Sequence, residues 1–135
     1  MPQKAKLLCI DDNPLNLKLM IDLFRHDYDI KVVNSALKGV ELLKTYTPDI
    51  ILLDVMMPDM DGYEFCQLVR KMPQFALTPI IFITAKSNPE DEKQAYASGG
   101  NDFITKPIIP ISLQAKVAMH LKLAAEARPA STSKS

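Results

Sequence analysis

Several residues that could do chemistry stand at the ends of short apolar runs in this sequence of 135 residues. Three are aspartates, one is a threonine and one is a lysine: Asp11, Asp12, Asp54, Thr84 and Lys106. Two carboxylates about 4 Å apart repel each other by roughly 4 kcal/mol at an effective dielectric constant of about 20. Three carboxylates in one place must therefore take up protons or hold a cation.

The ligand types indicate which cation such a cluster would hold. No histidine or cysteine is spaced for a zinc site, and carboxylate oxygens are hard ligands that select Mg²⁺, Mn²⁺ or Ca²⁺. Few protein ligands and several waters favour Mg²⁺, which proteins commonly bind beside a phosphate. Lys106 supplies a positive charge for one more anion. The residue types therefore predict a Mg²⁺ site suited to a phosphoryl group.

Each aspartate also has a purely structural interpretation. An aspartate at a strand end is often a helix cap or a turn former, and Asp11-Asp12 alone would not distinguish the two interpretations. Asp54 is followed by a loop that contains Pro58 and closes with Asp61-Gly62, so we expect a shaped loop beside it. We expect Asp59 and Asp61 to be more exposed and to act in turns.

These residues can meet only if the apolar runs form a parallel sheet. Three runs do not alternate apolar with polar residues and are typical of strands covered on both faces: 7–10, 50–53 and 80–83. Weaker strands are expected at 30–33 and 102–105. Segments with helical spacing lie between, and Asn13-Pro14 and Asn88-Pro89 predict helix starts. This order predicts one doubly wound α/β domain of five βα units, with helices on both faces and ligands outside the carboxyl ends of the strands.

The composition argues against several other classes of function. Sixteen Lys and Arg balance sixteen Asp and Glu without a basic face, so we expect no nucleic-acid binding by this domain. No apolar run approaches the ~18 residues of a membrane span, and the start does not resemble a signal peptide, so we expect no membrane and a cytoplasmic location. Cys9 and Cys66 are expected to be free, buried thiols. His26 and His120 are expected on helices, in surface or partly buried roles.

The segments together resemble the receiver domain of two-component response regulators. The resemblance rests on four segments in order: Asp11-Asp12-Asn13, 52–62, Thr84-Ala85 and 102–107. It covers residues 4–125, so that 126–135 is expected to be a disordered tail or the start of a linker. It implies a flavodoxin-like fold with strand order 2-1-3-4-5. One departure is Gly99-Gly100, where the family more often has Gly-Ala, and we expect it to affect only loop stiffness.

The resemblance implies a phosphoacceptor signalling domain rather than an enzyme. Asp54 would accept a phosphoryl group from a phosphohistidine of a sensor kinase or a histidine phosphotransfer protein. Asp12 would bind Mg²⁺ directly, Asp11 mostly through water, and Met56 through its backbone carbonyl. Lys106, with a cis bond to Pro107, would pair with a phosphoryl oxygen.

The resemblance also implies a switch that carries the signal to a partner. Thr84 would donate its hydroxyl to a phosphoryl oxygen and vacate space for the ring of Phe103. The face formed by the helix at 89–98, the strand of Phe103 and the helix at 111–125 would then bind a downstream effector or a second copy in a homodimer.

Two alternatives from other classes make different demands on the sequence. A Mg²⁺-dependent phosphohydrolase with an aspartyl nucleophile usually shows Asp-x-Asp in its first loop, whereas Asp11 and Asp12 are adjacent. A flavodoxin-like nucleotide carrier needs a Gly-, Ser- or Thr-rich loop after the first strand. The loop 11–14 would instead repel a phosphate.

Overall fold

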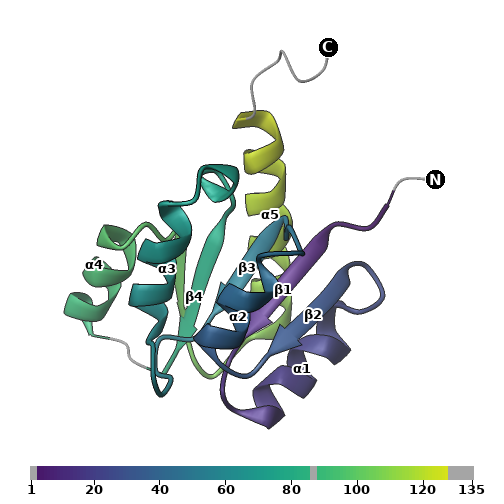
Figure 1. The fold of residues 1–135 in the computed structure, drawn as a ribbon. Helices are drawn as coiled ribbons and strands as arrows, with labels where there is room; N and C mark the ends of the chain where they lie inside the picture. Colours follow the sequence, from purple (N-terminus) through teal and green to yellow (C-terminus); the bar gives the residue numbers. More distant parts are fainter. Residues whose placement is uncertain (1–2, 86–87, 128–135) are drawn as a thin grey trace.

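The computed structural model describes residues 3–85 and 88–127, in which strands and helices alternate along the chain (Figure 1). The strands are β1 (Lys6–Ile10), β2 (Asp29–Val33), β3 (Ile50–Leu53), β4 (Ile80–Thr84) and β5 (Asp102–Thr105). The helices are α1 (Pro14–Phe24), α2 (Ala36–Leu42), α3 (Gly62–Arg70), α4 (Pro89–Ala97) and α5 (Pro110–Ala127), with a short 3₁₀ helix, η1, at Pro73–Phe75. The predicted order of five βα units is confirmed.

The strands form one parallel sheet in the order β2-β1-β3-β4-β5. The chain moves from β1 outward to β2 and then returns to the other side of β1, where β3 pairs with it. The strand order therefore reverses between β1 and β3. The fold class and strand order expected from the sequence are both confirmed, and the reversal marks where a ligand site is expected in a sheet of this kind.

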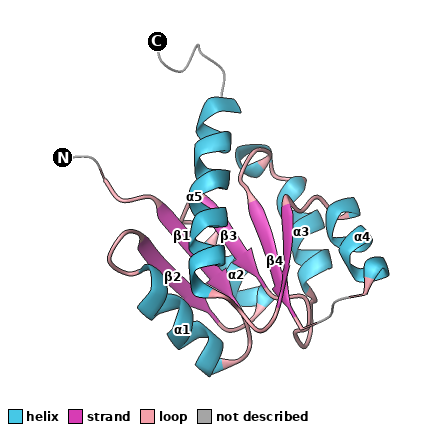
Figure 2. Ribbon diagram, turned by 180° about the vertical axis from the view of Figure 1, so that it is seen from behind, coloured by secondary structure: helices cyan, strands magenta, loops and turns pink. Residues whose placement is uncertain are grey.

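Helices cover both faces of the sheet. Figure 2 shows α1 and α5 over one face, and α2 and α3 lie over the other, with α4 beside α3 at the β5 side. The apolar residues of each strand divide between two buried clusters: Leu8 and Ile10 belong to the α2–α3 side, whereas Leu7 and Cys9 belong to the α1–α5 side. Burial on both sides explains why the central strands are continuous apolar runs without alternation.

The predicted helix starts are confirmed by their caps. The side chain of Asn13 accepts a hydrogen bond from the N–H of Leu15 at 2.9 Å, and Asn88 does the same for Asp91 at 2.9 Å. Such a cap satisfies one of the backbone donors that a helix start leaves without an internal partner. Because both helices start at the carboxyl end of a strand, the caps fix the chain next to the edge that carries the aspartates.

Three details differ from, or add to, the sequence-based expectations. His26 lies in the turn after α1 rather than on a helix. A Cβ at Gly100 would lie 2.6 Å from Cε2 of Phe82, so this glycine matters for packing against β4 and not only for loop stiffness. Helix α5 continues to Ala127, and residues 128–135 of the expected tail lie outside the described residues.

Among the described helices, none combines the length and apolar character that crossing a membrane requires.

Candidate functional site

The carboxyl ends of β1 and β3 bring the three aspartates together at the lower edge of the sheet in Figure 1. One carboxylate oxygen from each of Asp11, Asp12 and Asp54 lies within 4.8 Å of the others. Asp11 and Asp54 are buried, and Asp12 is exposed. The N–H of Asp54 donates to the carbonyl of Ile10 at 2.9 Å, so the sheet ladder itself aligns these two strand ends. The predicted clustering of the three acids is confirmed.

Asp11 is held by donors from three parts of the chain. Its Oδ1 accepts the backbone N–H of Asn13 at 2.9 Å. Its Oδ2 accepts both the side-chain amide of Asn16, at 3.1 Å, and the ammonium of Lys106, at 3.3 Å. These contacts, in all of which the carboxylate accepts, fix the orientation of a buried side chain.

Asp54 follows the central strand, β3, and is harder to ionise than an ordinary aspartate. Burial, and next the charge of Asp11, raise its pKa from 3.8 to about 6. Lys106, whose Nζ lies 3.9 Å from Oδ2 of Asp54, opposes that shift, as do the backbone N–H groups of Val55 and Met56. A cation bound among these acids would favour the ionised form of Asp54. By the same linkage, ionised Asp54 would strengthen the binding of that cation.

The loop after Asp54 folds back against it, as the turn signals predicted. The N–H of Gly62 donates to the carbonyl of Val55 at 2.9 Å, and a Cβ at position 62 would overlap the carbonyl oxygen of Asp54. Only glycine allows this close approach of two backbone segments. Asp59, exposed and with a φ of 69°, forms the turn, whereas Asp61 caps α3 in a reciprocal capping box with Glu64.

Lys106 comes from the end of β5, on the far side of β4 from Asp54. Its N–H donates to the carbonyl of Thr84 at 2.8 Å, and the bond between Lys106 and Pro107 is cis, as the resemblance implied. Its ammonium pairs with both Asp11 and Asp54. The side chain therefore spans from β5 to the acids, where its single positive charge pairs with two of the three carboxylates.

Thr84 and Phe103 lie on the α3 side of β4 and β5. Thr84 is fully buried at the last position of β4, and Phe103 is half-buried against the apolar cluster of that side. Phe82 pairs in register with Phe103, and Thr84 pairs with Thr105, so Thr84 lies one step further along the same face. The Met56 side chain is exposed, and nothing in the geometry tests a role for its carbonyl.

One residue of the site was not anticipated from the sequence. Asn16 reaches Asp11 from the first turn of α1, five residues along the chain. The only local signal is a second asparagine three residues after the capping Asn13, and a polar residue in an exposed first turn is too common to be singled out.

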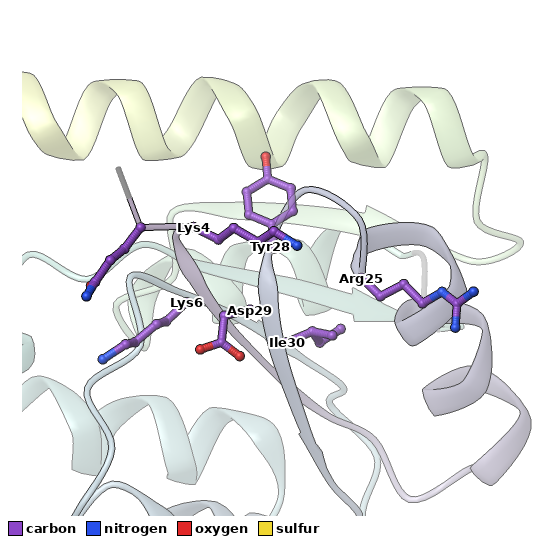
Figure 3. A pocket seen from close by; sticks show the side chains of 7 residues that line it. Lys4, Lys6, Arg25, Tyr28, Asp29 and Ile30 are labelled. Atoms are coloured by element: carbon purple, nitrogen blue, oxygen red, sulfur yellow. The ribbon is translucent and has the colours of Figure 1, made fainter. Parts of the chain in front are cut away.

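One sizeable hollow lies away from this cluster. It has a volume of about 600 Å³ and is formed at the opposite edge of the sheet, where β1 and β2 begin. Figure 3 shows that its charged groups point in different directions, with Arg25 turned away from Lys4 and Lys6. A ligand there would meet no converging set of polar groups, so this hollow is not the candidate site.

The geometry agrees with comparisons to known proteins. The profile of the family described as "Response regulator receiver domain" matches residues 7–118. A probable cyclic di-GMP phosphodiesterase of Vibrio cholerae is 37% identical over 88% of this chain and 27% of its own length. The transcriptional regulatory protein YvrH of Bacillus subtilis is 34% identical over 89% of this chain and 50% of its own.

Solved structures agree at the level of the whole domain. The signal receiver domain of a histidine kinase from Syntrophus aciditrophicus superposes with a TM-score of 0.81 at 30% identity, covering 87% of this chain and 90% of that one. The chemotaxis response regulator CheY4 of Vibrio cholerae gives a TM-score of 0.83 at 26% identity, covering 87% of this chain and 99% of that one.

The fold and the acidic edge thus define a phosphoacceptor signalling domain, and they do not favour the alternative of a phosphohydrolase. The chain belongs to the response regulator receiver domain family of two-component systems. It spans half or less of the length of the first curated relatives that it matches, which include the signal transduction histidine-protein kinase BarA of Escherichia coli. Domains of this family are generally non-catalytic parts of signalling proteins.

Proposed function

We propose that Asp54 is the phosphoacceptor of this domain and that it works with Mg²⁺ bound beside it. The observation that carries the proposal is the convergence of three carboxylates and the Lys106 ammonium at one edge of the sheet. Asp54 follows the central strand of the sheet, it is buried, and its pKa is raised to about 6. At neutral pH it is therefore still mostly ionised, as a nucleophile must be.

The residues present fit a hard divalent cation. Asp12 is exposed and free to turn its carboxylate toward a metal, so we assign it as a direct ligand together with Asp54. Asp11 already accepts three donors, which suits contact through water. The backbone carbonyl of Met56 completes the proposed set. When bound, Mg²⁺ would offset the charge of the acids and of the phosphoryl oxygens.

The transfer itself needs a nucleophile and fixed positive charge. A carboxylate oxygen of Asp54 forms the new O–P bond while the P–N bond of the donor phosphohistidine breaks, and the imidazole leaves with that electron pair and takes up a proton. The transition state is loose, with charge on three equatorial oxygens. Lys106 and the hydroxyl of Thr84, which come from the ends of β5 and β4, are assigned to two of these oxygens.

The donor and the output of the domain belong to the same proposal. The donor is a phosphohistidine on a sensor kinase or a histidine phosphotransfer protein. The downstream partner, to which the domain passes the signal, is an effector protein or domain. A cytoplasmic location accords with the free, buried thiols Cys9 and Cys66, which are typical of a reducing compartment.

The phosphorylated state is proposed to alter the face made by α4, β5 and α5. Thr84 and Phe103 lie one register step apart along this side of the sheet, so a shift of Thr84 toward a phosphoryl oxygen leaves room for the ring of Phe103. The altered face would bind an effector or a second copy. Amide exchange and sedimentation, with and without beryllofluoride, test this step. Changes confined to the Asp54 loop would contradict it.

Intact-mass measurement after incubation with acetyl phosphate and Mg²⁺ tests the acceptor. The wild-type domain is expected to gain one acid-labile phosphoryl group, and Asp54→Asn none. Asp59→Asn is the matched control, because Asp59 is an exposed aspartate of the same loop and asparagine tolerates its positive φ. A phosphoryl adduct that persists on Asp54→Asn would place the acceptor elsewhere.

A further inference from the structure

Asn16 is a half-buried polar residue in the first turn of α1 to which the proposed transfer assigns no role. Asparagine is a weak helix former, because its side chain competes for nearby backbone groups. Here the side chain turns instead to Asp11, and its Nδ2 donates to Oδ2 of that carboxylate at 3.1 Å. Helix formation therefore gives no reason for an asparagine at this position, whereas the contact with Asp11 does.

The oxygen that Asn16 contacts is shared with Lys106. The Lys106 ammonium lies 3.3 Å from the same Oδ2 and 3.9 Å from Asp54. A metal ion and an ammonium compete for the same carboxylates, because both are cations. The amide of Asn16 is neutral, so it orients Asp11 without weakening the negative potential that attracts a metal. The two donors on Oδ2 thus have different consequences for the site.

We propose, building on the proposed function, that Asn16 is a positioning residue for the Mg²⁺ site. It holds Asp11 through a neutral donor, so that Asp11 keeps its orientation when Lys106 turns from it toward the phosphoryl group. The N–H of Asn13 fixes the other oxygen at 2.9 Å, which leaves Asn16 to fix the rotation that brings Oδ2 toward the cluster. Partners that orient a metal-binding carboxylate in this way commonly set the metal affinity.

The test compares Asn16→Leu, which removes the amide, with Asn16→Gln, which keeps it on a longer side chain. Mg²⁺ affinity is measured from backbone amide shifts in NMR titrations, and the rate of phosphorylation by acetyl phosphate is followed against Mg²⁺ concentration. Asn16→Leu is expected to weaken Mg²⁺ binding by about tenfold. Its rate at saturating Mg²⁺ is expected to stay within about twofold of wild type, because the nucleophile and Lys106 are unchanged. Asn16→Gln is expected to recover most of the affinity.

The control is Gln94→Leu, which makes the same change from an amide to leucine at an exposed position of another helix, α4. It is expected to leave the Mg²⁺ affinity unchanged. If Asn16 had a purely structural role, Asn16→Leu would lower thermal stability and leave the Mg²⁺ affinity unchanged. We expect Asn16→Leu to keep its thermal stability instead, because leucine is a better helix former than asparagine.

Two results would overturn the proposal in distinguishable ways. Equal Mg²⁺ affinity in wild type and folded Asn16→Leu removes the role of Asn16 and leaves the proposed function intact. A wild-type domain that does not bind Mg²⁺ removes both. If Asn16→Leu does not fold, the NMR signals of the Asn16 side-chain amide in the wild-type domain test the proposal instead. They are expected to shift with Mg²⁺ when those of Gln94 do not, and an unchanged Asn16 signal would contradict the proposal.

Discussion

Two aspartates of this domain lie in buried charge clusters of opposite character. Asp54 shares its surroundings with two other acids and one ammonium, and burial followed by the charge of Asp11 raises its pKa to about 6. Asp102, at the start of β5, is also partly buried, which opposes its ionisation. Hydrogen bonds from His120, the N–H of Phe103 and Lys116 outweigh that effect and lower the pKa of Asp102.

The difference separates a site built for a ligand from one built for the fold. Asp102 has donors at 2.8, 3.2 and 2.9 Å from its own chain and needs no further partner. Its donors Lys116 and His120 both belong to α5, so the cluster fastens that helix to β5. The cluster around Asp54 holds three acids, and among the described residues only Lys106 is paired with them, so that it offsets only part of their negative charge. A cation bound there relieves a cost that folding imposes, and it would also offset the charge of an added phosphoryl group.

Removing one acid from the ligand site gives the largest expected effect. Asp12→Asn is expected to weaken Mg²⁺ binding by roughly tenfold or more, because a charged ligand is lost. In metal-free buffer the same variant is expected to be as stable as wild type or more so, because like-charge repulsion falls. Mg²⁺ titration and urea unfolding on the same samples measure both quantities. Unchanged Mg²⁺ affinity would contradict the assignment of Asp12 as a ligand.

Removing the acid from the other cluster is expected to change stability in the opposite direction. Asp102→Asn leaves His120 and Lys116 without an ionised acceptor and is expected to lower the free energy of unfolding by about 1–3 kcal/mol. Urea unfolding measures the loss, and Asp59→Asn, an exposed aspartate, is the matched control. Mg²⁺ affinity is expected to stay at the wild-type value. A loss of Mg²⁺ affinity in Asp102→Asn would show that the two clusters are not independent.

The opposite pKa shifts predict opposite pH dependence in metal-free buffer. Asp54 has a raised pKa, so the folded state binds its proton more tightly than the unfolded state, and its contribution to stability increases as the pH falls through about 6. Asp102 has a lowered pKa, so its contribution is present above the ordinary value of 3.8 and is lost as the pH falls below that value. Stability is therefore expected to rise from pH 7 to pH 5, by on the order of 1 kcal/mol, and to fall at lower pH.

Thermal unfolding at a series of pH values checks this profile. Asp54→Asn is expected to remove the rise between pH 7 and pH 5 and to keep the acid loss. Asp102→Asn is expected to keep the rise between pH 7 and pH 5 and to reduce the loss of stability at lower pH. Saturating Mg²⁺ is expected to suppress the rise in wild type, because a bound cation favours the ionised acid. A rise that survives in Asp54→Asn would assign the titration to another group.

Much of this comparison could be predicted from the sequence, but not all of it. Asp54 was identified because it closes a buried strand, and that position alone places it at the ligand edge of a parallel sheet. The order of the strands came from the family resemblance, since an apolar run does not specify its neighbour. The pairing of Asp102 with His120 was not predicted, because it joins residues 18 positions apart through the packing of α5. The conflict between a Cβ at Gly100 and the ring of Phe82 is likewise tertiary and has no local pattern.

The smallest expected effect separates the two side-chain partners of Asp102, Lys116 and His120. The side chain of Lys116 is 39% exposed, and water screens its pair with Asp102 at 3.2 Å, whereas His120 is 11% exposed and lies 2.9 Å away. Exposed pairs contribute little, so Lys116→Met is expected to lower the free energy of unfolding by about 0.2–1 kcal/mol. Lys122→Met is the control, because Lys122 is an exposed lysine of the same helix, and it is expected to change stability less. Urea unfolding at pH 7 and at pH 3 distinguishes the two variants. The deficit of Lys116→Met is expected to be smaller at pH 3 than at pH 7, because the contribution of ionised Asp102 to stability declines as the pH falls below the ordinary value of 3.8. An unchanged deficit would mean that the lysine stem acts by packing.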